Sequence, residues 1–200
     1  VETVARVTVN VLAAAGLQGC FVGSMACSQY GLGRVPNDID IVVLTSEKTA
    51  EELKDLLVRT DSRFYLVRSK DPFAKYRILY SSYLLGCYHA CKVNILLPRT
   101  MNIPPVPQNL VVRIRDFLLM PIIPLLLLKL QAWLDHGSAT KQHLREKQFV
   151  DAQDINQLLT LAVARGMKLS AEAWMPESFV EAAKSRVIVY DKHFPGSRSH

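Results

Sequence analysis

Two aspartates, Asp38 and Asp40, stand two positions apart in the run Asp-Ile-Asp-Ile-Val-Val-Leu. The β-branched residues of this run favour a strand, and a strand repeats every two residues, so both carboxylates share one face. Neighbouring carboxylates repel each other unless a cation lies between them. Mg²⁺ is the natural cation, because it takes carboxylate oxygens and then phosphate oxygens. The alternative is a solvent-exposed strand face with two acidic residues.

A second feature precedes the aspartates at Gly23-Ser24, where a short apolar run ends. Glycine allows a phosphate to approach the backbone closely, and a serine hydroxyl can bind a phosphate oxygen. A Gly-Ser turn is weak evidence alone. Its order with the acidic pair, as strand, Gly-Ser, helix, loop and Asp-x-Asp strand, is more specific and predicts a phosphate and metal pocket.

The elements around these residues follow from hydrophobic spacing and from glycine and proline positions. We expect an α/β (α+β) fold with a helical C-terminal lobe. The predicted strands cover 19–22, 38–44, 63–68, 76–80 and 88–97, and the predicted helices cover 2–15, 25–30, 47–59, 121–135, 140–165 and 177–192. Thr45-Ser46 is the expected cap of the third helix.

Four prolines, Pro98, Pro104, Pro105 and Pro107, mark a change in composition, because proline is excluded from sheet interiors. We therefore predict a core over 1–98, a Pro-rich connection over 99–120 and a helical lobe over 121–200.

The order of Val22-Gly23-Ser24 and Asp38-Ile39-Asp40 resembles the nucleotidyltransferase superfamily, with its polymerase-beta-like fold. The resemblance covers about residues 10–97. It implies a mixed sheet flanked by helices, with Mg²⁺ held by Asp38 and Asp40 and a nucleoside triphosphate such as ATP as a partner. The implied activity is transfer of a nucleoside monophosphate to an acceptor hydroxyl.

The family also uses a third carboxylate on a later strand, and the matching position here is Asn94. An amide offers a carbonyl oxygen but carries no charge and takes up no proton. Two alternatives to an active transferase therefore stay open. One is a degenerate member that binds nucleotide or RNA without turnover, and the other is a non-catalytic interaction module.

The C-terminal half bears a weaker resemblance to toxin-type and antibiotic-modifying nucleotidyltransferases. It rests on Lys129 in one helix and on Asp151-Ala152-Gln153-Asp154-Ile155 in the next. The resemblance implies that Lys129 contacts phosphates and that Asp151 organises the nucleotide site. The alternative for Asp151 and Asp154 is an exposed helix face.

Basic and aromatic residues alternate between 59 and 77, a pattern that fits single-stranded RNA or a charged sheet edge. The residues are Arg59, Arg63, Arg68, Lys70, Lys75 and Arg77 with Phe64, Tyr65, Phe73 and Tyr76. Cys87, His89 and Cys91 alternate as zinc ligands on a strand could, but buried thiols beside a core histidine fit better. We expect His136 and His143 at the surface.

The formal net charge of +6 favours acidic partners such as nucleotides or RNA. Four cysteines in apolar segments indicate a reducing compartment, so an intracellular, cytoplasmic location is expected. The apolar run from Pro121 is too short and too interrupted to span a membrane. The sequence begins at Val1, as a chain that has lost an N-terminal segment would, and it indicates no oligomeric state.

Overall fold

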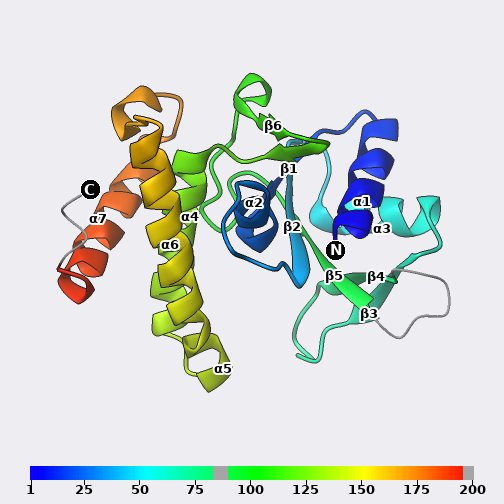
Figure 1. Cartoon of the computed structure of the whole chain (residues 1–200). Coiled ribbons are helices and arrows are strands. Elements are labelled where there is room, and N and C mark those ends of the chain that lie inside the picture. The colour runs from blue at the N-terminus through cyan, green and yellow to red at the C-terminus, as the bar shows by residue number, and fades with distance from the viewer. Residues whose placement is uncertain (83–89, 196–200) are drawn as a thin grey trace. The chain divides into compact units, whose positions relative to one another are not determined.

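A computed structural model describes residues 1–82 and 90–195 and divides the chain into two compact units (Figure 1). Unit 1 comprises Val1–Met101 and Pro107–Met120, and unit 2 comprises Asn102–Val106 and Pro121–His200. The connection expected over 99–120 is therefore shared between the units, and each unit is described by itself.

Unit 1 is a sheet flanked by helices. Its helices are α1 (Glu2–Ala14), α2 (Gly23–Gln29) and α3 (Ala50–Thr60), with a 3-10 turn at Gln108–Leu110. Its strands are β1 (Gly19–Val22), β2 (Asp38–Val43), β3 (Phe64–Arg68), β4 (Arg77–Ser82), β5 (Ala90–Leu96), β6 (Val112–Ile114) and β7 (Phe117–Leu119). The expected strands and helices of this region are confirmed, apart from residues 88 and 89, which lie outside the described residues.

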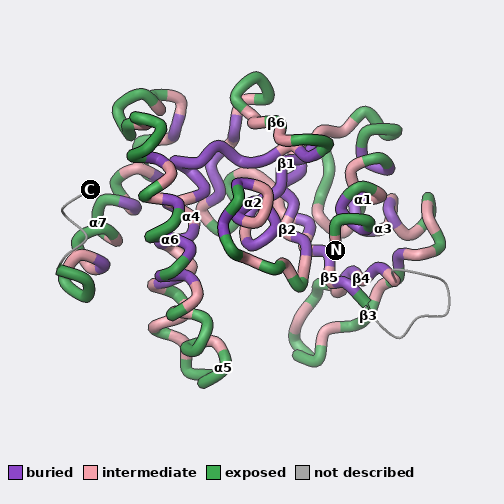
Figure 2. The backbone as a smooth tube through the Cα atoms, viewed as in Figure 1, coloured by how far each residue is buried: buried purple, intermediate pink, exposed green. Residues whose placement is uncertain are grey.

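The seven strands form one mixed sheet in the order β3-β4-β5-β2-β1-β7-β6. Strand β2 runs parallel to β5 and antiparallel to β1, so the acidic strand lies in the middle of the sheet. Its core-facing residues Ile39 and Ile41 are fully buried. Figure 2 shows the buried centre of this sheet and its more exposed periphery.

Strands β6 and β7 differ from the sequence prediction, which gives a Pro-rich connection over 99–120 and no strand there. All four prolines precede Val112, so none interrupts either strand. Phe117 of β7 packs edge-on against Phe21 of β1, with ring centroids 5.6 Å apart. The backbone N–H of Met120 also donates to the Phe21 carbonyl at 2.9 Å. These contacts extend the sheet beyond β1.

Helix α3 begins three residues later than predicted, and the expected cap at Thr45-Ser46 is wrong. Thr49 is the N-cap, and its side chain accepts from the Glu52 N–H at 3.3 Å. Glu52 in turn accepts from the Thr49 N–H at 2.7 Å. This reciprocal capping box satisfies two helix N–H groups and fixes where the helix starts.

Unit 2 is helical, as expected. It contains α4 (Ile122–Gly137), α5 (Gln142–Arg145), α6 (Lys147–Ala164), a 3-10 turn at Leu169–Ala171, and α7 (Glu177–His193). The helix predicted over 140–165 is thus divided into α5 and α6. A core of Leu130, Trp133, Ala152, Ile155 and Tyr190 joins α4, α6 and α7. Among the described residues, no helix is both long enough and apolar enough to cross a membrane.

Candidate active site

Gly23 lies where β1 passes directly into α2, beside the acidic strand. Its φ of 61° falls in the left-handed region, which L-residues with a side chain rarely adopt. A Cβ at this position would overlap Oδ2 of Asp40. The register of the sheet explains this contact, because Val22 pairs with Asp40 across β1 and β2. Glycine is therefore required here both by conformation and by space.

Ser24 follows in the first turn of α2 and is 6% exposed. Within the described part of the chain, its Oγ has no hydrogen-bond partner. A buried hydroxyl without a partner is unfavourable unless a ligand or water completes it. This is the one observation at Ser24 that agrees with a bound polar group, such as a phosphate oxygen.

Asp38 and Asp40 lie on the same face of β2, opposite the buried Ile39 and Ile41. Both aspartates are partly exposed, so their carboxylates are accessible. The sequence prediction of a shared face agrees with the strand bounds and with the register. The pair offers hard oxygen donors on a rigid central strand, which is the donor type that Mg²⁺ prefers.

Asn94 on β5 lies directly opposite Asp40 in the parallel pair. Its Nδ2 donates to Asp40 Oδ1 at 2.7 Å. The position aligned with the family's third carboxylate thus adjoins the acidic pair. With an amide there, the three side chains carry two negative charges when both aspartates are ionised.

The donor set fits a divalent cation. Two carboxylates and the Asn94 carbonyl oxygen are hard ligands, and Gly23 leaves the space next to Asp40 Oδ2 without a side chain. Within residues 1–82 and 90–195, no group of three or more His, Cys, Asp or Glu has a metal-binding arrangement. Any cation at Asp38 and Asp40 would therefore depend on oxygen atoms from a ligand or water to complete its coordination.

Lys129 and Asp151, the other predicted nucleotide-binding residues, lie in unit 2 on α4 and α6. Lys129 Nζ lies 3.3 Å from Asp151 Oδ1 and 2.8 Å from Asp154 Oδ2. All three residues are buried, so the exposed helix face considered for the two aspartates is wrong. The cause is Lys129, which interrupts the apolar face of α4 and draws both carboxylates inward.

His136 joins this cluster, because its Nδ1 lies 2.5 Å from Asp151 Oδ2. His136 is only partly exposed and has a carboxylate partner that the sequence prediction did not include, whereas His143 is exposed as expected. The signal for His136 was its spacing from Lys129. Seven residues make about two helical turns, so both side chains face α6.

The three cysteines that the structure describes are not exposed nucleophiles. Cys20, Cys27 and Cys91 are buried. Burial raises the pKa of the Cys20 thiol to about 12. Cys87 and His89, considered as zinc ligands with Cys91, lie outside the described residues.

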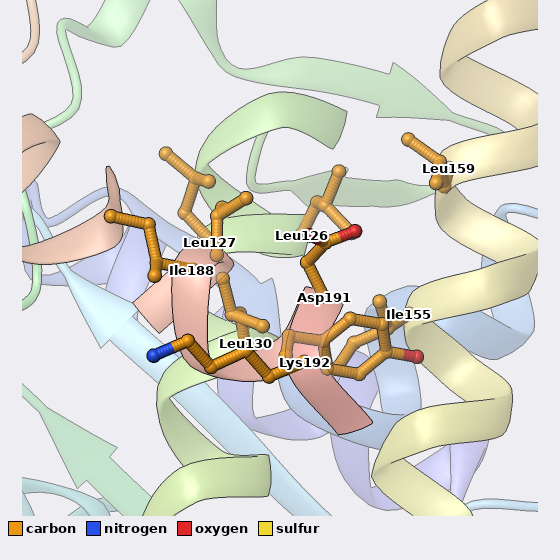
Figure 3. A pocket seen from close by; sticks show the side chains of 10 residues that line it. Leu126, Leu127, Leu130, Ile155, Leu159, Ile188, Asp191 and Lys192 are labelled. Atoms are coloured by element: carbon orange, nitrogen blue, oxygen red, sulfur yellow. The ribbon is translucent and has the colours of Figure 1, made fainter. Parts of the chain in front are cut away.

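Unit 2 contains an apolar groove of about 410 Å³ between α4, α6 and α7 (Figure 3). It is lined by Leu126, Leu127, Leu130, Ile155, Leu159, Val187, Ile188, Tyr190, Asp191 and Lys192. None of the predicted site residues lines it. Its apolar walls are unlike a site for a triphosphate.

The chain shares its fold with a nucleotidyltransferase-like structure. A crystal structure of an antigenic nucleotidyltransferase-like protein from Paracoccidioides brasiliensis matches it with a TM-score of 0.60 and 17% identity. The match covers 80% of this chain and 75% of that one. No protein-family profile and no curated protein matches the sequence. The predicted mixed sheet flanked by helices, of the nucleotidyltransferase type, is thereby confirmed as the fold.

Proposed function

We propose that the chain binds a Mg²⁺–nucleoside triphosphate complex at Asp38 and Asp40 and transfers its nucleoside monophosphate to an acceptor hydroxyl. The observation that carries the proposal is the contact of Gly23 with Asp40, which brings the Gly-Ser segment and the acidic strand side by side. The nucleotidyltransferase-like fold supports it, because this is the fold that the resemblance of the motif implied.

Each residue has a chemical role in this proposal. Gly23 lets the backbone of the Gly-Ser turn lie against Asp40 and thereby beside the bound phosphate, and the buried Ser24 hydroxyl donates to a phosphate oxygen. Asp38 and Asp40 hold the cation, and Asn94 orients Asp40 through its hydrogen bond. When bound, Mg²⁺ neutralises charge on the triphosphate and on the two carboxylates.

The proposed reaction balances without any further reactant. The acceptor oxygen forms a bond to the α-phosphorus, and the bond from this phosphorus to the bridging oxygen of the β-phosphate breaks. Pyrophosphate leaves with that electron pair. The acceptor's proton passes to an aspartate of the site or to water.

Lys129 and Asp151 remain predictions as nucleotide-binding residues. Their buried ion pair means that Lys129 would have to exchange a carboxylate for a phosphate oxygen, both of which are anionic acceptors.

A second candidate function is nucleotide or RNA binding without turnover. The observation in its favour is the hydrogen bond from Asn94 to Asp40, because an amide at this position cannot serve as a base. A non-catalytic interaction module is the third possibility, in which the acidic pair has no ligand.

Two measurements separate the three candidates. Thermal unfolding with millimolar Mg²⁺ and ATP tests binding, because a ligand of the folded state raises the melting temperature. Pyrophosphate release by the wild type and by Asn94→Asp, with each nucleoside triphosphate and mixed acceptors, tests turnover. Release by the wild type that Asp40→Asn abolishes supports the transferase.

Stabilisation without release by the wild type, together with release by Asn94→Asp, supports the degenerate binder. If neither ATP nor another nucleoside triphosphate shifts the melting temperature, nucleotide binding and transfer are excluded, and RNA binding or the interaction module stands. Asp116→Asn is a matched control, because Asp116 is an exposed aspartate of the same unit whose ion pair is with Arg6.

A further inference from the structure

One face of the sheet carries a continuous row of four side chains that starts at the acidic pair. Asp38 of β2 pairs with Lys92 of β5, Lys92 pairs with Tyr80 of β4, and Tyr80 pairs with Tyr65 of β3. Paired residues on neighbouring strands point to the same side of a sheet. Because β3 is an edge strand, the row runs from the proposed metal site to the edge of the sheet, and Figure 1 shows the four strands that carry it.

This row lies on the face opposite α3. Arg77 of β4 forms ion pairs with Glu51 at 2.8 Å and with Asp55 at 2.9 Å, both on α3. Arg77 and Tyr80 are three positions apart, so they point to opposite faces of β4. Helix α3 therefore packs on the other face of the sheet and does not cover the row.

The outer end of the row is a pair of stacked rings. The centroids of Tyr65 and Tyr80 lie 5.8 Å apart with 21° between the ring planes. Tyr65 is 41% exposed, so part of an aromatic surface is in contact with solvent. Rings of this kind are the platforms on which bases of single-stranded nucleic acid stack.

Lys92 lies in the middle of the row, and no carboxylate of the described residues pairs with it. Lys92 is partly exposed, and no carboxylate of residues 1–82 or 90–195 lies within 4.0 Å of its ammonium. Its strand neighbour Asp38 is thus not neutralised by it. Lysine between an aromatic platform and a metal site suits a backbone phosphate.

A purely structural explanation accounts for only part of this arrangement. Stacked tyrosines stabilise an antiparallel pair, and charges on an edge strand discourage pairing with other sheets. However, both rings lie on the sheet face rather than along its open edge. A lysine opposite an aspartate can also stabilise a sheet. However, none of the ion pairs within 4.0 Å in the described residues joins Lys92 to Asp38, which leaves the ammonium for another anion.

We propose that this row, Asp38, Lys92, Tyr80 and Tyr65, binds the end of a single-stranded nucleic acid that serves as the acceptor. The bases stack on the two tyrosines, a backbone phosphate pairs with Lys92, and the terminal hydroxyl reaches Asp38 and Asp40. Three strand spacings make the row about 14 Å long, which is the length of about four stacked nucleotides. The acceptor role rests on the function proposed above, and the binding does not.

The exposed cations Lys70 and Lys75 of the β3–β4 loop add charge complementarity at the sheet edge. They follow and precede the strands that carry the tyrosines. The formal net charge of +6 acts in the same direction. These charges favour a polyanion, and the rings favour one with bases.

Fluorescence anisotropy with a 5′-labelled single-stranded RNA dodecamer, without nucleotide or Mg²⁺, tests the row. We expect Tyr65→Leu and Tyr80→Leu each to weaken binding about 10- to 100-fold, because a stacked base is lost. Tyr65→Phe and Tyr80→Phe keep the ring and should retain binding. Lys92→Gln should reduce the slope of log K against log salt by about 0.7, the value for one phosphate contact of a single strand.

Matched controls are Phe149→Leu, an exposed aromatic of unit 2, and Arg59→Gln, an exposed cation on α3. Phe149→Leu should weaken binding less than Tyr65→Leu or Tyr80→Leu does. Arg59→Gln should change the affinity and its salt dependence less than Lys92→Gln does. Melting curves for every variant establish that the fold is kept. A DNA strand of the same sequence distinguishes the two kinds of nucleic acid, and binding of either one supports the row.

Three results would overturn the proposal. The first is equal affinity for a matched duplex, and the second is equal competition by a polyglutamate peptide of the same charge, which would indicate an acidic protein partner. The third is unchanged affinity in folded Tyr65→Leu and Tyr80→Leu. Asp40→Asn separates this proposal from the previous one, because it should remove stabilisation by Mg²⁺ and ATP while oligonucleotide binding remains.

Discussion

The side-chain amide of Asn94 donates a hydrogen bond to Asp40 Oδ1 across the parallel strands β5 and β2, with an N···O distance of 2.7 Å. A carboxylate at this position would instead repel Asp40 in the absence of a cation. The amide thus holds an ionised Asp40 in place without metal. It also lowers the negative charge that the site offers to metal.

Replacing Asn94 by Asp should remove the amide hydrogen bond to Asp40 and add a negative charge that can bind a metal ion. We expect Asn94→Asp to melt at a lower temperature than the wild type without Mg²⁺, and to gain more stability from millimolar Mg²⁺. Asn94→Ala should lose about 1 to 3 kcal/mol, because Asp40 loses a hydrogen bond to a charged group, and it should gain less from Mg²⁺ than Asn94→Asp. Melting temperatures at several Mg²⁺ concentrations measure both effects. A Mg²⁺ response of Asn94→Asp no larger than that of the wild type would contradict metal binding here.

Substitution of Gly23 should be much more harmful than substitution of an unconstrained glycine in the same region. In Gly23→Ala the new methyl group overlaps Asp40 Oδ2, and the φ of 61° is unfavourable for alanine. We expect lower stability and loss of any stabilisation by Mg²⁺ and ATP. Gly33→Ala is the control, since a Cβ there would meet no atom of the described structure within 4 Å. Equal melting temperatures of the two variants would disprove the close packing.

The central part of the site was predictable because its signals are local. The period of two in Asp38-Ile39-Asp40 determines a face, and a glycine followed by a serine marks the turn into α2. The contact between Asn94 and Asp40 depends on how β5 and β2 are aligned. Because parallel strands have no hairpin to set their register, only the family resemblance suggested this contact.

Two other features were not predicted from the sequence, and each has a physical cause. The four prolines of the connection favoured a region without strands, although Val112, Ile114, Phe117 and Leu119 alternate with other residues as strand residues do. The Lys129 cluster forms between two helices, and intervals along the sequence identify a helix face but not its neighbour. Tertiary packing determined both outcomes.

Removal of the buried cation in unit 2 should cost more than its removal together with one of its carboxylate partners. Lys129→Met leaves Asp151 and Asp154 buried without the ammonium between them, and we expect a loss of about 3 to 5 kcal/mol. Replacing Asp154 by Leu in the same variant removes one of the stranded charges and should recover part of that loss. Urea unfolding measures each free energy. Lys184→Met, which breaks the exposed pair with Glu181, should have no measurable effect.

The ion pairs of Arg77 with Glu51 and Asp55 should make unit 1 less stable in acid. The hydrogen bond from Arg77 lowers the pKa of Asp55. Partial burial tends to raise the pKa of Glu51, but the hydrogen bonds from Lys54 and Arg77 outweigh it, and the net direction is also downward. Both carboxyl groups therefore bind protons more weakly in the folded protein than in the unfolded chain, and folding is favoured while they are ionised.

The sign of the pH dependence follows from these lowered values. The stabilisation is fully present above the unfolded pKa values, which are about 4, and is lost as the pH falls through the lower folded values. We expect the free energy of unfolding to decrease below about pH 4.5 in the wild type, and to decrease less steeply in Arg77→Met. Urea unfolding across the acid range measures both slopes, with Lys184→Met as a control for a solvent-exposed pair. Equal acid slopes for the wild type and Arg77→Met would show that the link between α3 and β4 contributes no pH-dependent stability.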